Sequence, residues 1–282
     1  MARQVRAAIV QTRTPATAEA GWAHLEPLVR AAAAQGATLV ATPEGSNLLQ
    51  RDRALFDLAV PTEADPAVLE RPAALARELG ITLLVGSVLV ARQAGEKAAN
   101  RSLLFGPDGA LLASYDKIHL FDVNLGGLGQ ETRESNSYRP GDAAVLADTP
   151  AGRLGLTICY DLRFPHLYRA LAQAGAEILA VPAAFTRPTG EAHWDVLLRA
   201  RAIETGSFVL APAQGGLHAD GRETYGNSLI IGPWGEVLAR CAGQEPGFAV
   251  ADLDLDAVAE ARRRIPAWQL DQPFTRPAAG AA

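Results

Sequence analysis

The sequence predicts an α/β fold built from two halves of similar design. Short apolar runs, typical of buried strands, alternate with stretches whose apolar residues recur at helical spacing. Each half also carries a hairpin signal, at residues 107–109 in the first half and 233–235 in the second. A hydrophobic share of 49% and a charged share of 20% over 282 residues indicate a globular chain with a sizeable core.

The first half predicts a βαβ unit, then a second helix, a strand and a hairpin. Its helices stop at Gly36 and Gly80, because glycine readily adopts the left-handed conformation that ends helices. The segment 120–142 has no periodicity and many Gly, Asn and Ser residues, which is typical of a long functional or disordered loop. The expected ranges are strands at 5–11, 37–44 and 81–90, helices at 17–35 and 66–80, and the hairpin at 101–117.

The second half repeats this order of elements. One of its helices begins near Pro165, a residue that favours the first turn of a helix. We expect one domain over residues 1–270 and a flexible tail over 271–282. The expected ranges are strands at 153–161, 176–185 and 207–214, helices at 164–175 and 191–206, and the hairpin at 227–240.

Charge and cysteine content bound the partners and the compartment. A net charge of −5 argues against nucleic acid and anionic lipid as partners. No apolar run approaches the ~20 residues of a membrane span, and the early apolar stretch is too short for a signal peptide. The two cysteines, Cys159 and Cys241, suit a reducing compartment. We therefore expect a cytoplasmic protein.

Cys159 stands at the end of the strand 153–161, directly before a charged loop and a helix. A cysteine attacks as its thiolate, which a helix N-terminus favours. Glu44 and Lys117 close two other predicted strands, and Glu134 lies in the long loop. Ligands of α/β sheets bind at the carboxyl ends of strands, so these side chains can converge on one site. The plain alternative is two surface charges and a small core residue, and the pattern alone leaves both interpretations open.

Three segments resemble the motifs of the nitrilase superfamily of carbon–nitrogen hydrolases. They are TPEGSNLL (42–49), YDKIHLFD (115–122) and GLTICYDLRFPHLYRALAQAGAEIL (155–179). The resemblance extends from about Val5 to the RRRIPAW segment, nearly the whole chain. It implies that Glu44, Lys117 and Cys159 are the triad of this family and that Glu134 is its second glutamate.

The resemblance also implies a fold, an assembly and a mechanism. The fold is a four-layer αββα sandwich, and the assembly is a homodimer with helices after Cys159 and around 194–204 facing the partner. Glu44, expected to be buried with a raised pKa, is the general base, and Cys159 forms a thioester. Lys117 and the backbone N–H of Tyr160 hold the oxyanion. Glu134 orients Lys117 or the leaving nitrogen, and no metal or cofactor is required.

Within the superfamily, three segments are most similar to the deaminated-glutathione amidase and ω-amidase branch, and closer to the former. The branch implies that the terminal amide of a small carboxylate-bearing substrate, first of all deaminated glutathione, is cleaved to a carboxylic acid and ammonia. Such a substrate needs a cationic clamp, for which arginine is best suited. Arg163, four residues after the nucleophile, is the first candidate; Thr186 and Arg187 end the strand 176–185, where a substrate tail could run. The three segments are CYDLRFPHL, AFTRPTGEAHWDVLLRARAIET and YGNSLIIGPWGEVLAR.

Several alternatives stay open at this point. An ω-amidase acting on small dicarboxylic monoamides such as α-ketoglutaramate, an N-carbamoyl amino acid hydrolase and a nitrilase all use the same triad. A non-catalytic scaffold has no reason to keep Glu44, Lys117 and Cys159 together. A papain-type protease needs C-G-[SA]-C-[WY] at its nucleophile, whereas Tyr160 and Asp161 follow Cys159.

Overall fold

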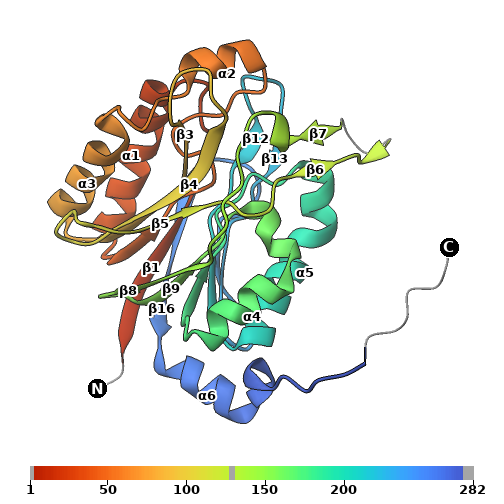
Figure 1. The fold of residues 1–282 in the computed structure, drawn as a ribbon. Helices are drawn as coiled ribbons and strands as arrows, with labels where there is room; N and C mark the ends of the chain where they lie inside the picture. Colours follow the sequence, from red (N-terminus) through yellow and green to blue (C-terminus); the bar gives the residue numbers. More distant parts are fainter. Residues whose placement is uncertain (1–2, 127–130, 276–282) are drawn as a thin grey trace.

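The computed structural model describes residues 3–126 and 131–275 of the chain. Two six-stranded sheets lie face to face, and helices cover the outer face of each (Figure 1). This arrangement confirms the expected four-layer αββα sandwich.

The first sheet joins the two ends of the described chain. Its strand order is β16-β1-β2-β3-β4-β5, and β16, near the end of the chain, pairs antiparallel with β1. The β1–β2–β3 pairings are parallel, and β3, β4 and β5 pair antiparallel. The strands are β1 (Gln4–Gln11), β2 (Leu39–Ala41), β3 (Thr82–Ala91), β4 (Ala98–Phe105), β5 (Leu111–Asp116) and β16 (Gly247–Asp254).

The second sheet has the same mixed design, in the order β15-β14-β11-β10-β9-β8. Strands β9, β10 and β11 are parallel, and antiparallel strands flank them on both sides. The strands are β8 (Val145–Thr149), β9 (Gly152–Leu156), β10 (Ile178–Ala180), β11 (Phe208–Ala211), β14 (Leu229–Ile231) and β15 (Val237–Arg240).

Each outer layer consists of two long helices. Helices α1 (Ala18–Ala34) and α3 (Ala67–Leu79) contact the first sheet, and α4 (Pro165–Gln173) and α5 (Arg187–Thr205) contact the second (Figure 1). Gly80 ends α3 at a φ of 63°, as its position in the sequence predicts.

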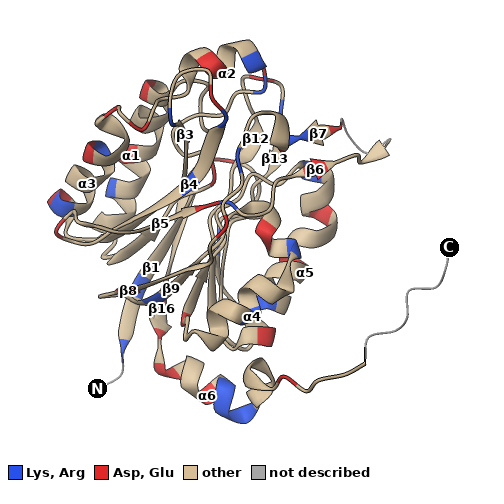
Figure 2. Cartoon of the chain, in the orientation of Figure 1, with Lys and Arg blue, Asp and Glu red and all other residues tan. Residues whose placement is uncertain are grey.

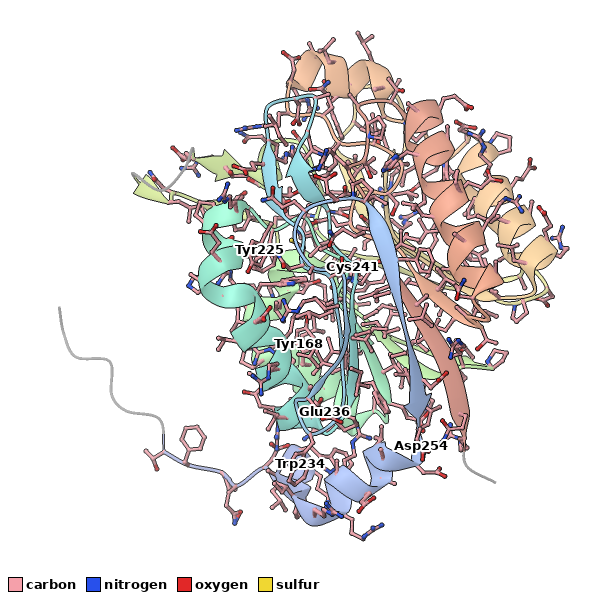
Figure 3. All side chains as sticks on the ribbon, turned by 180° about the vertical axis from the view of Figure 1, so that it is seen from behind. Tyr168, Tyr225, Trp234, Glu236, Cys241 and Asp254 are labelled. Atoms are coloured by element: carbon pink, nitrogen blue, oxygen red, sulfur yellow. The ribbon has the colours of Figure 1, made fainter. Side chains whose placement is uncertain are left out.

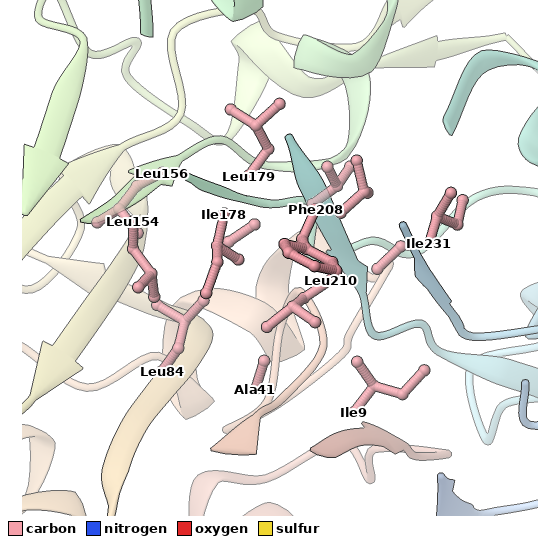
Figure 4. Packing of buried hydrophobic residues seen from close by; sticks show 14 of the residues in the cluster. Ile9, Ala41, Leu84, Leu154, Leu156, Ile178, Leu179, Phe208, Leu210 and Ile231 are labelled. Atoms are coloured by element: carbon pink, nitrogen blue, oxygen red, sulfur yellow. The ribbon is translucent and has the colours of Figure 1, made fainter. Parts of the chain in front are cut away.

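The core between the sheets follows from strand alternation. In β1, Ile9 packs into the cluster between the sheets, whereas its neighbours Ala8 and Val10 pack against the helices of the first layer. In Figure 4, Ile178 and Leu210 of the second sheet point toward the first sheet, on the side where Leu84 and Ala41 lie. Because both faces of these strands are buried, their sequences are almost continuously apolar.

Several predicted strands are shorter than expected. The ranges 37–44, 153–161 and 176–185 keep only β2, β9 and β10, and the residues that follow each strand form loops. These loops carry the polar residues described below. The pattern of apolar letters extends past the last ladder hydrogen bond because the loop backbone is itself buried.

Other elements were missing from the prediction. Strands β8 and β16 fill edge positions, and neither has a strict apolar pattern because part of each strand is exposed. The long loop 120–142 contains short elements, and its residues 127–130 lie outside the described ranges. The additional small elements are α2 (Arg53–Ala59), α6 (Asp256–Arg264), β6 (Asp122–Val123), β7 (Thr132–Arg133), β12 (Gly215–Leu217), β13 (Glu223–Tyr225), η2 (Glu134–Asn136), η3 (Cys159–Arg163) and η4 (Pro266–Gln269).

The start of the expected tail is attached to the domain. Asp271 accepts hydrogen bonds from Arg169 and from Gln173, at 2.6 Å and 2.8 Å. Residues 276–282 of that tail lie outside the described part. None of the helices within residues 3–126 and 131–275 has the length and apolar character needed to cross a bilayer. Acidic and basic residues are interspersed over the elements (Figure 2).

Candidate active site

The structure brings Glu44, Lys117 and Cys159 together at one end of the sandwich. Glu44 follows β2 and Lys117 follows β5 in the first sheet, whereas Cys159 follows β9 in the second. The Lys117 ammonium lies 2.9 Å from Oε1 of Glu44, and the thiol of Cys159 is hydrogen-bonded to the same carboxylate. Glu44 and Cys159 line a cavity of about 420 Å³, a volume within the ~300–1,000 Å³ range of small-molecule sites.

Glu44 is held by more than the lysine. Asn100 of β4 donates to Oε1 at 2.7 Å, and the backbone N–H of Ala184 donates to Oε2 at 2.9 Å. The carboxylate therefore has a fixed orientation toward the cavity. Asn100 escaped the sequence analysis; an amide side chain inside a buried apolar strand was the available signal.

The loop that carries Glu44 fits against the second sheet because residue 86 is a glycine. A Cβ at Gly86 would lie 1.8 Å from the carbonyl oxygen of Thr42 and 2.4 Å from a carbon of Pro182. Ser87, the next residue, accepts a hydrogen bond from the N–H of Gly45 at 2.8 Å. The close approach of these backbones places Glu44 next to the loop that follows β10.

Cys159 occupies a sharp turn between β9 and the helices. Its φ of 53° lies in the left-handed region, which is uncommon for a residue with a side chain. The N–H of Cys159 donates to the carbonyl of Pro182 at 2.9 Å. The expected single strand-to-helix junction is thus a strand, a 3₁₀ turn (η3) and then α4. Tyr160 follows in the first turn of η3, where backbone N–H groups lack intrahelical acceptors.

Glu134 completes the buried charge cluster. Its two oxygens lie 3.1 Å and 2.9 Å from the ammonium of Lys117, and Oε2 also accepts from the N–H of Phe121. Lys117 is 1% exposed and lies between the two carboxylates. The ammonium is therefore paired with both carboxylates, and the cluster faces the cavity through Glu44 and Glu134.

The cluster sets the protonation of its members. Burial raises the pKa of Glu44, but the charge of Lys117 and hydrogen bonds from Cys159, Lys117 and Asn100 outweigh it and lower the pKa below its ordinary value. Burial lowers the pKa of Lys117, yet Glu134 and Glu44 raise it well above the ordinary value. Burial and the charge of Glu44 raise the pKa of the Cys159 thiol well above its ordinary value. The resting site is an ionised Glu44, a protonated Lys117 and a neutral thiol.

One expectation about Glu44 is confirmed and one is wrong. The side chain is buried, at 6% exposure, as expected. Its pKa is lowered and not raised, because the sequence pattern could not say how many donors would surround the carboxylate. An ionised carboxylate beside a neutral thiol is suited to take the thiol proton during attack.

The predicted substrate-binding residues divide into two groups. Tyr160 and Thr186 line the cavity. Arg163 and Arg187 are not among the residues that line it, and a substrate-binding role for either of them stays a prediction. The guanidinium of Arg163 lies over the rings of Tyr160 and Phe185, two cavity walls, 5.9 Å and 5.4 Å from their centroids.

The two arginines outside the cavity differ in their partners. Arg187 is paired with Glu191 at 2.9 Å and with Glu223 at 2.8 Å, so its charge is already neutralised. Arg163 contacts His193 at 3.2 Å, and within the described residues it has no carboxylate partner inside 4 Å. Arg163 therefore keeps its charge available near the cavity wall.

Three arginines that the sequence analysis did not single out line the cavity, namely Arg51, Arg133 and Arg222. Arg133 is paired with Glu131 at 2.6 Å. Arg222 belongs to the turn between β12 and β13, and its acidic neighbour Asp220 is 3.5 Å away. The sequence around Arg222 gives no signal for a role in the cavity, because it reads as a charged residue in a glycine-containing turn. Only the fold brings that hairpin to the cavity.

Cys241, the second cysteine, lies apart from this chemistry. It follows β15, and its N–H donates to Ser228 (Figure 3). It is not among the residues that line the cavity, and burial raises the pKa of its thiol to about 11. Both cysteines are free thiols.

Comparison with known proteins agrees with this architecture. The family model for carbon-nitrogen hydrolase matches residues 6–263. The chain is 45% identical to human deaminated glutathione amidase over 251 residues, which cover 87% of this chain and 76% of that protein. It is 42% identical to the deaminated glutathione amidase of Yersinia enterocolitica over 238 residues, 83% of this chain and 82% of that protein.

Solved structures give the same result. The C. elegans NitFhit protein superposes with a TM-score of 0.86 at 32% identity, over 95% of this chain and 65% of that one, so the chain spans just under two thirds of it. An amidase from Nesterenkonia superposes with a TM-score of 0.76 at 29% identity over 93% of this chain and 98% of that one, and its structure contains acrylamide added to an active-site cysteine. The chain therefore belongs to the carbon-nitrogen hydrolase family of the nitrilase superfamily and is a hydrolase that acts on amides.

Proposed function

We propose that this protein is a cysteine-dependent amidase whose substrate is deaminated glutathione. The observation that carries the proposal is the buried contact of Lys117 with Glu44, beside a thiol on the cavity wall. Relatives named deaminated glutathione amidase, at 42–45% identity over most of the chain, support the substrate. Catalysis by the triad is part of the proposal.

Acylation comes first. The Sγ of Cys159 attacks the amide carbonyl carbon, and its proton passes to the ionised carboxylate of Glu44. Lys117 and the N–H of Tyr160 stabilise the oxyanion, a contribution of about 3 kcal/mol per donor. Glu44 then gives its proton to the leaving nitrogen, the C–N bond breaks, and a thioester to Cys159 remains.

Deacylation reuses the same base. Glu44 takes a proton from a water molecule, which attacks the thioester carbonyl. The C–S bond breaks, the acid leaves, and Cys159 recovers its proton from Glu44. Glu134 keeps Lys117 in place through both halves, because its carboxylate neutralises an ammonium that is otherwise costly to bury.

The substrate determines the leaving group. In a glutathione-like tripeptide the amide nitrogen belongs to the next amino acid, so cleavage of the deaminated substrate releases a peptide amine. Ammonia, which the sequence analysis expected as the product, is released only when the amide is primary, as in α-ketoglutaramate, so that expectation does not hold for deaminated glutathione. An assay for ammonia alone would therefore miss the proposed reaction.

Two arginines match the two carboxylates of such a substrate. We assign Arg163 to the carboxylate on the acyl side, because it follows Cys159 by four residues and has no described carboxylate partner. We assign Arg222, which lines the cavity, to the carboxylate of the leaving peptide. Planar guanidinium groups bind carboxylates through two parallel hydrogen bonds.

A substrate panel tests the proposal. We would measure acid and amine release by mass spectrometry from deaminated glutathione, α-ketoglutaramate, succinamate, an N-carbamoyl amino acid and a simple nitrile. We expect deaminated glutathione to have the highest kcat/KM by at least about tenfold, equal to ~1.4 kcal/mol of transition-state binding. A preference for α-ketoglutaramate, a carbamoyl substrate or a nitrile would replace the proposed substrate with that one.

We also propose a homodimer in the cytoplasm. The exposed apolar side chains of Val196 and Ile203 on α5 support a contact through that helix. The free thiols of Cys159 and Cys241 fit a reducing compartment. Cell fractionation with an antibody to the protein tests the location, and the dimer is tested below.

A further inference from the structure

Asp161 is a fully buried carboxylate two residues after the nucleophile. Its oxygens accept hydrogen bonds from two separate segments of the chain. Tyr115 donates its hydroxyl to Oδ2 at 2.6 Å, and the N–H of Ile158 donates to the same oxygen at 2.8 Å. The N–H of His119 and its ring Nδ1 lie 3.1 Å and 2.7 Å from Oδ1. The backbone and the ring of His119 thus both lie within hydrogen-bond distance of the same oxygen of Asp161.

The positions of these donors are unusual. Tyr115 and His119 stand two residues before and two residues after Lys117. Ile158 immediately precedes Cys159, and Asp161 follows it by two. One carboxylate thus ties both flanks of the lysine segment to both flanks of the nucleophile turn.

The arrangement is rigid for three reasons. An ionised group buried without donors is very costly, and here both oxygens are satisfied twice. Tyr115, which provides one tie, also accepts a hydrogen bond from the N–H of Ile118 at 3.3 Å. His119, which provides another, stacks on Phe164 with ring centroids 3.5 Å apart. Neither donor can swing away without breaking a second contact.

We propose that Asp161 is a positioning residue that fixes the ammonium of Lys117 relative to the thiol of Cys159. Asp161 is absent from the cavity lining and touches no reacting atom of the proposed mechanism. Its effect passes through the two segments that it joins. The proposal rests on the proposed function only in that Lys117 and Cys159 act together.

A simpler role for Asp161 is to cap η3, since it binds the N–H of Ile158. The two roles separate at Tyr115, because Tyr115→Phe removes a tie on the lysine side and leaves the cap intact. Tyr168→Phe is the matched control. Tyr168 (labelled in Figure 3) is equally buried, and its hydroxyl is hydrogen-bonded to Thr157 at 2.8 Å. Among the described residues it makes no hydrogen bond to Asp161, so Tyr168→Phe removes a buried hydroxyl without cutting a tie to that carboxylate.

The first measurement does not depend on any amide substrate. In a Cys241→Ser background, the rate of Cys159 alkylation by iodoacetamide is followed against pH. The charge of Lys117 lowers the pKa of the Cys159 thiol, and the carboxylate of Glu44 raises it. If Tyr115→Phe lets Lys117 move away, the alkylation profile shifts to higher pH. A shift of about half a unit reduces the thiolate about threefold at a given pH.

The second measurement is turnover of the best amide of the panel. We expect Tyr115→Phe to lower kcat about tenfold or more with KM changed less than twofold, because an oxyanion donor acts mainly on the transition state. Tyr168→Phe should stay within twofold of the parent in both measurements. Asp161→Asn should shift the alkylation profile further and lower kcat more than Tyr115→Phe does. Circular dichroism reports whether the Asp161→Asn variant folds.

Two results would overturn the proposal. Equal behaviour of Tyr115→Phe and Tyr168→Phe would mean that Asp161 serves only as a cap. An unchanged alkylation profile in Tyr115→Phe would mean that Lys117 does not move with its flanking residues. If the parent enzyme hydrolyses no amide, the proposed function fails, and the alkylation profile still decides the positioning role.

Discussion

At the scale of single residues, the buried charges of the site are stabilised because they are paired with one another. Two carboxylates and a thiol surround one buried ammonium, and the charge of Lys117 together with three hydrogen-bond donors leaves Glu44 ionised and able to accept a proton. Burial alone would favour a protonated Glu44 and a neutral Lys117, because it raises the pKa of the acid and lowers the pKa of the amine. The reactivity of the thiol follows from the base beside it and not from a depressed pKa.

Replacement of the thiol should abolish turnover. We expect Cys159→Ala to lower kcat by at least about 10³-fold, since the other cysteine, Cys241, does not line the cavity and cannot replace the lost thiol. Cys241→Ser should stay close to the parent, because that thiol lies outside the cavity lining. Intact-mass measurement with a slow amide should find an acyl adduct in the parent and none in Cys159→Ala; an adduct on the alanine variant would exclude Cys159.

Removal of the central cation should cost stability in a pH-dependent way. The lowered pKa of Glu44 means that its stabilisation is present above the ordinary carboxyl pKa of 4.5 and is lost as the pH falls through the folded value. In Lys117→Met, burial and Glu134 should raise the pKa of Glu44, so the variant gains stability as the pH falls. We expect a loss of about 3–5 kcal/mol at pH 8 and a smaller loss at pH 5.

Urea unfolding at the two pH values measures this difference. Lys97, the other lysine of the sequence, is exposed, and Lys97→Met is the matched control. Its unfolding free energy should change little at either pH. A loss in Lys117→Met that is equal at pH 5 and pH 8 would contradict the charge assignment.

The two arginines should separate by substrate. We expect Arg163→Ala to lower kcat/KM for both deaminated glutathione and α-ketoglutaramate, and Arg222→Ala to affect mainly the former. The loss of about 30-fold or more corresponds to ~2 kcal/mol, the lower end for breaking a desolvated charge pair. Arg240→Ala, in an exposed pair with Asp195, is the control. Equal losses for charged and uncharged amides would assign both arginines to the scaffold.

At the scale of elements, the site depends on loops that begin where short strands end. Strands β2, β9 and β10 have only three to five residues, and the buried loops after them carry Glu44, Cys159 and Thr186. Loops of this kind are normally mobile, so each must be fixed by contacts of its own. Gly86 of β3 permits one such contact, because it lies against Thr42 of the Glu44 loop and against Pro182 of the loop after β10.

A methyl group at Gly86 should reduce activity, which depends on the position of Glu44, more than it reduces the stability of the fold. We expect Gly86→Ala to be destabilised and to lose most of its activity, since backbone atoms of Thr42 must move away from the new Cβ. Gly247→Ala is the matched control, because a Cβ at Gly247 in β16 meets nothing within 4 Å. Melting temperature and kcat of both variants decide the point, and a fully active Gly86→Ala would refute it.

At the scale of the whole molecule, the outer face of α5 leaves apolar side chains uncovered in a single chain. Val196 is 69% exposed, and Ile203 lies two turns further along the same helix. We expect Val196→Glu to convert a dimer to a monomer in light scattering, because a charge in an apolar contact is unpaired. Leu58→Glu on α2, where Leu58 is 85% exposed, should leave the assembly unchanged. A monomeric parent would refute the proposed dimer.

The sequence by itself determined the fold class, the family and the identity of the clustered residues Glu44, Lys117, Cys159 and Glu134. Strand and helix periodicity is local, and each motif keeps its reactive residue within a few positions of a strand end. Such information is readable from neighbouring letters. The order of strands and helices, and the end of a helix at Gly80, could therefore be predicted without knowledge of distant partners.

Only the tertiary structure decided how those residues are charged and what surrounds them. The lowered pKa of Glu44 comes from donors on β4, on the lysine segment and on the nucleophile turn, up to 115 positions away in the chain. The same holds for Arg222, which reaches the cavity through the β12–β13 hairpin, and for Arg187, which is neutralised by two glutamates. Electrostatic and packing energies depend on distances in space, and long-range pairing of two sheets sets those distances independently of any local pattern.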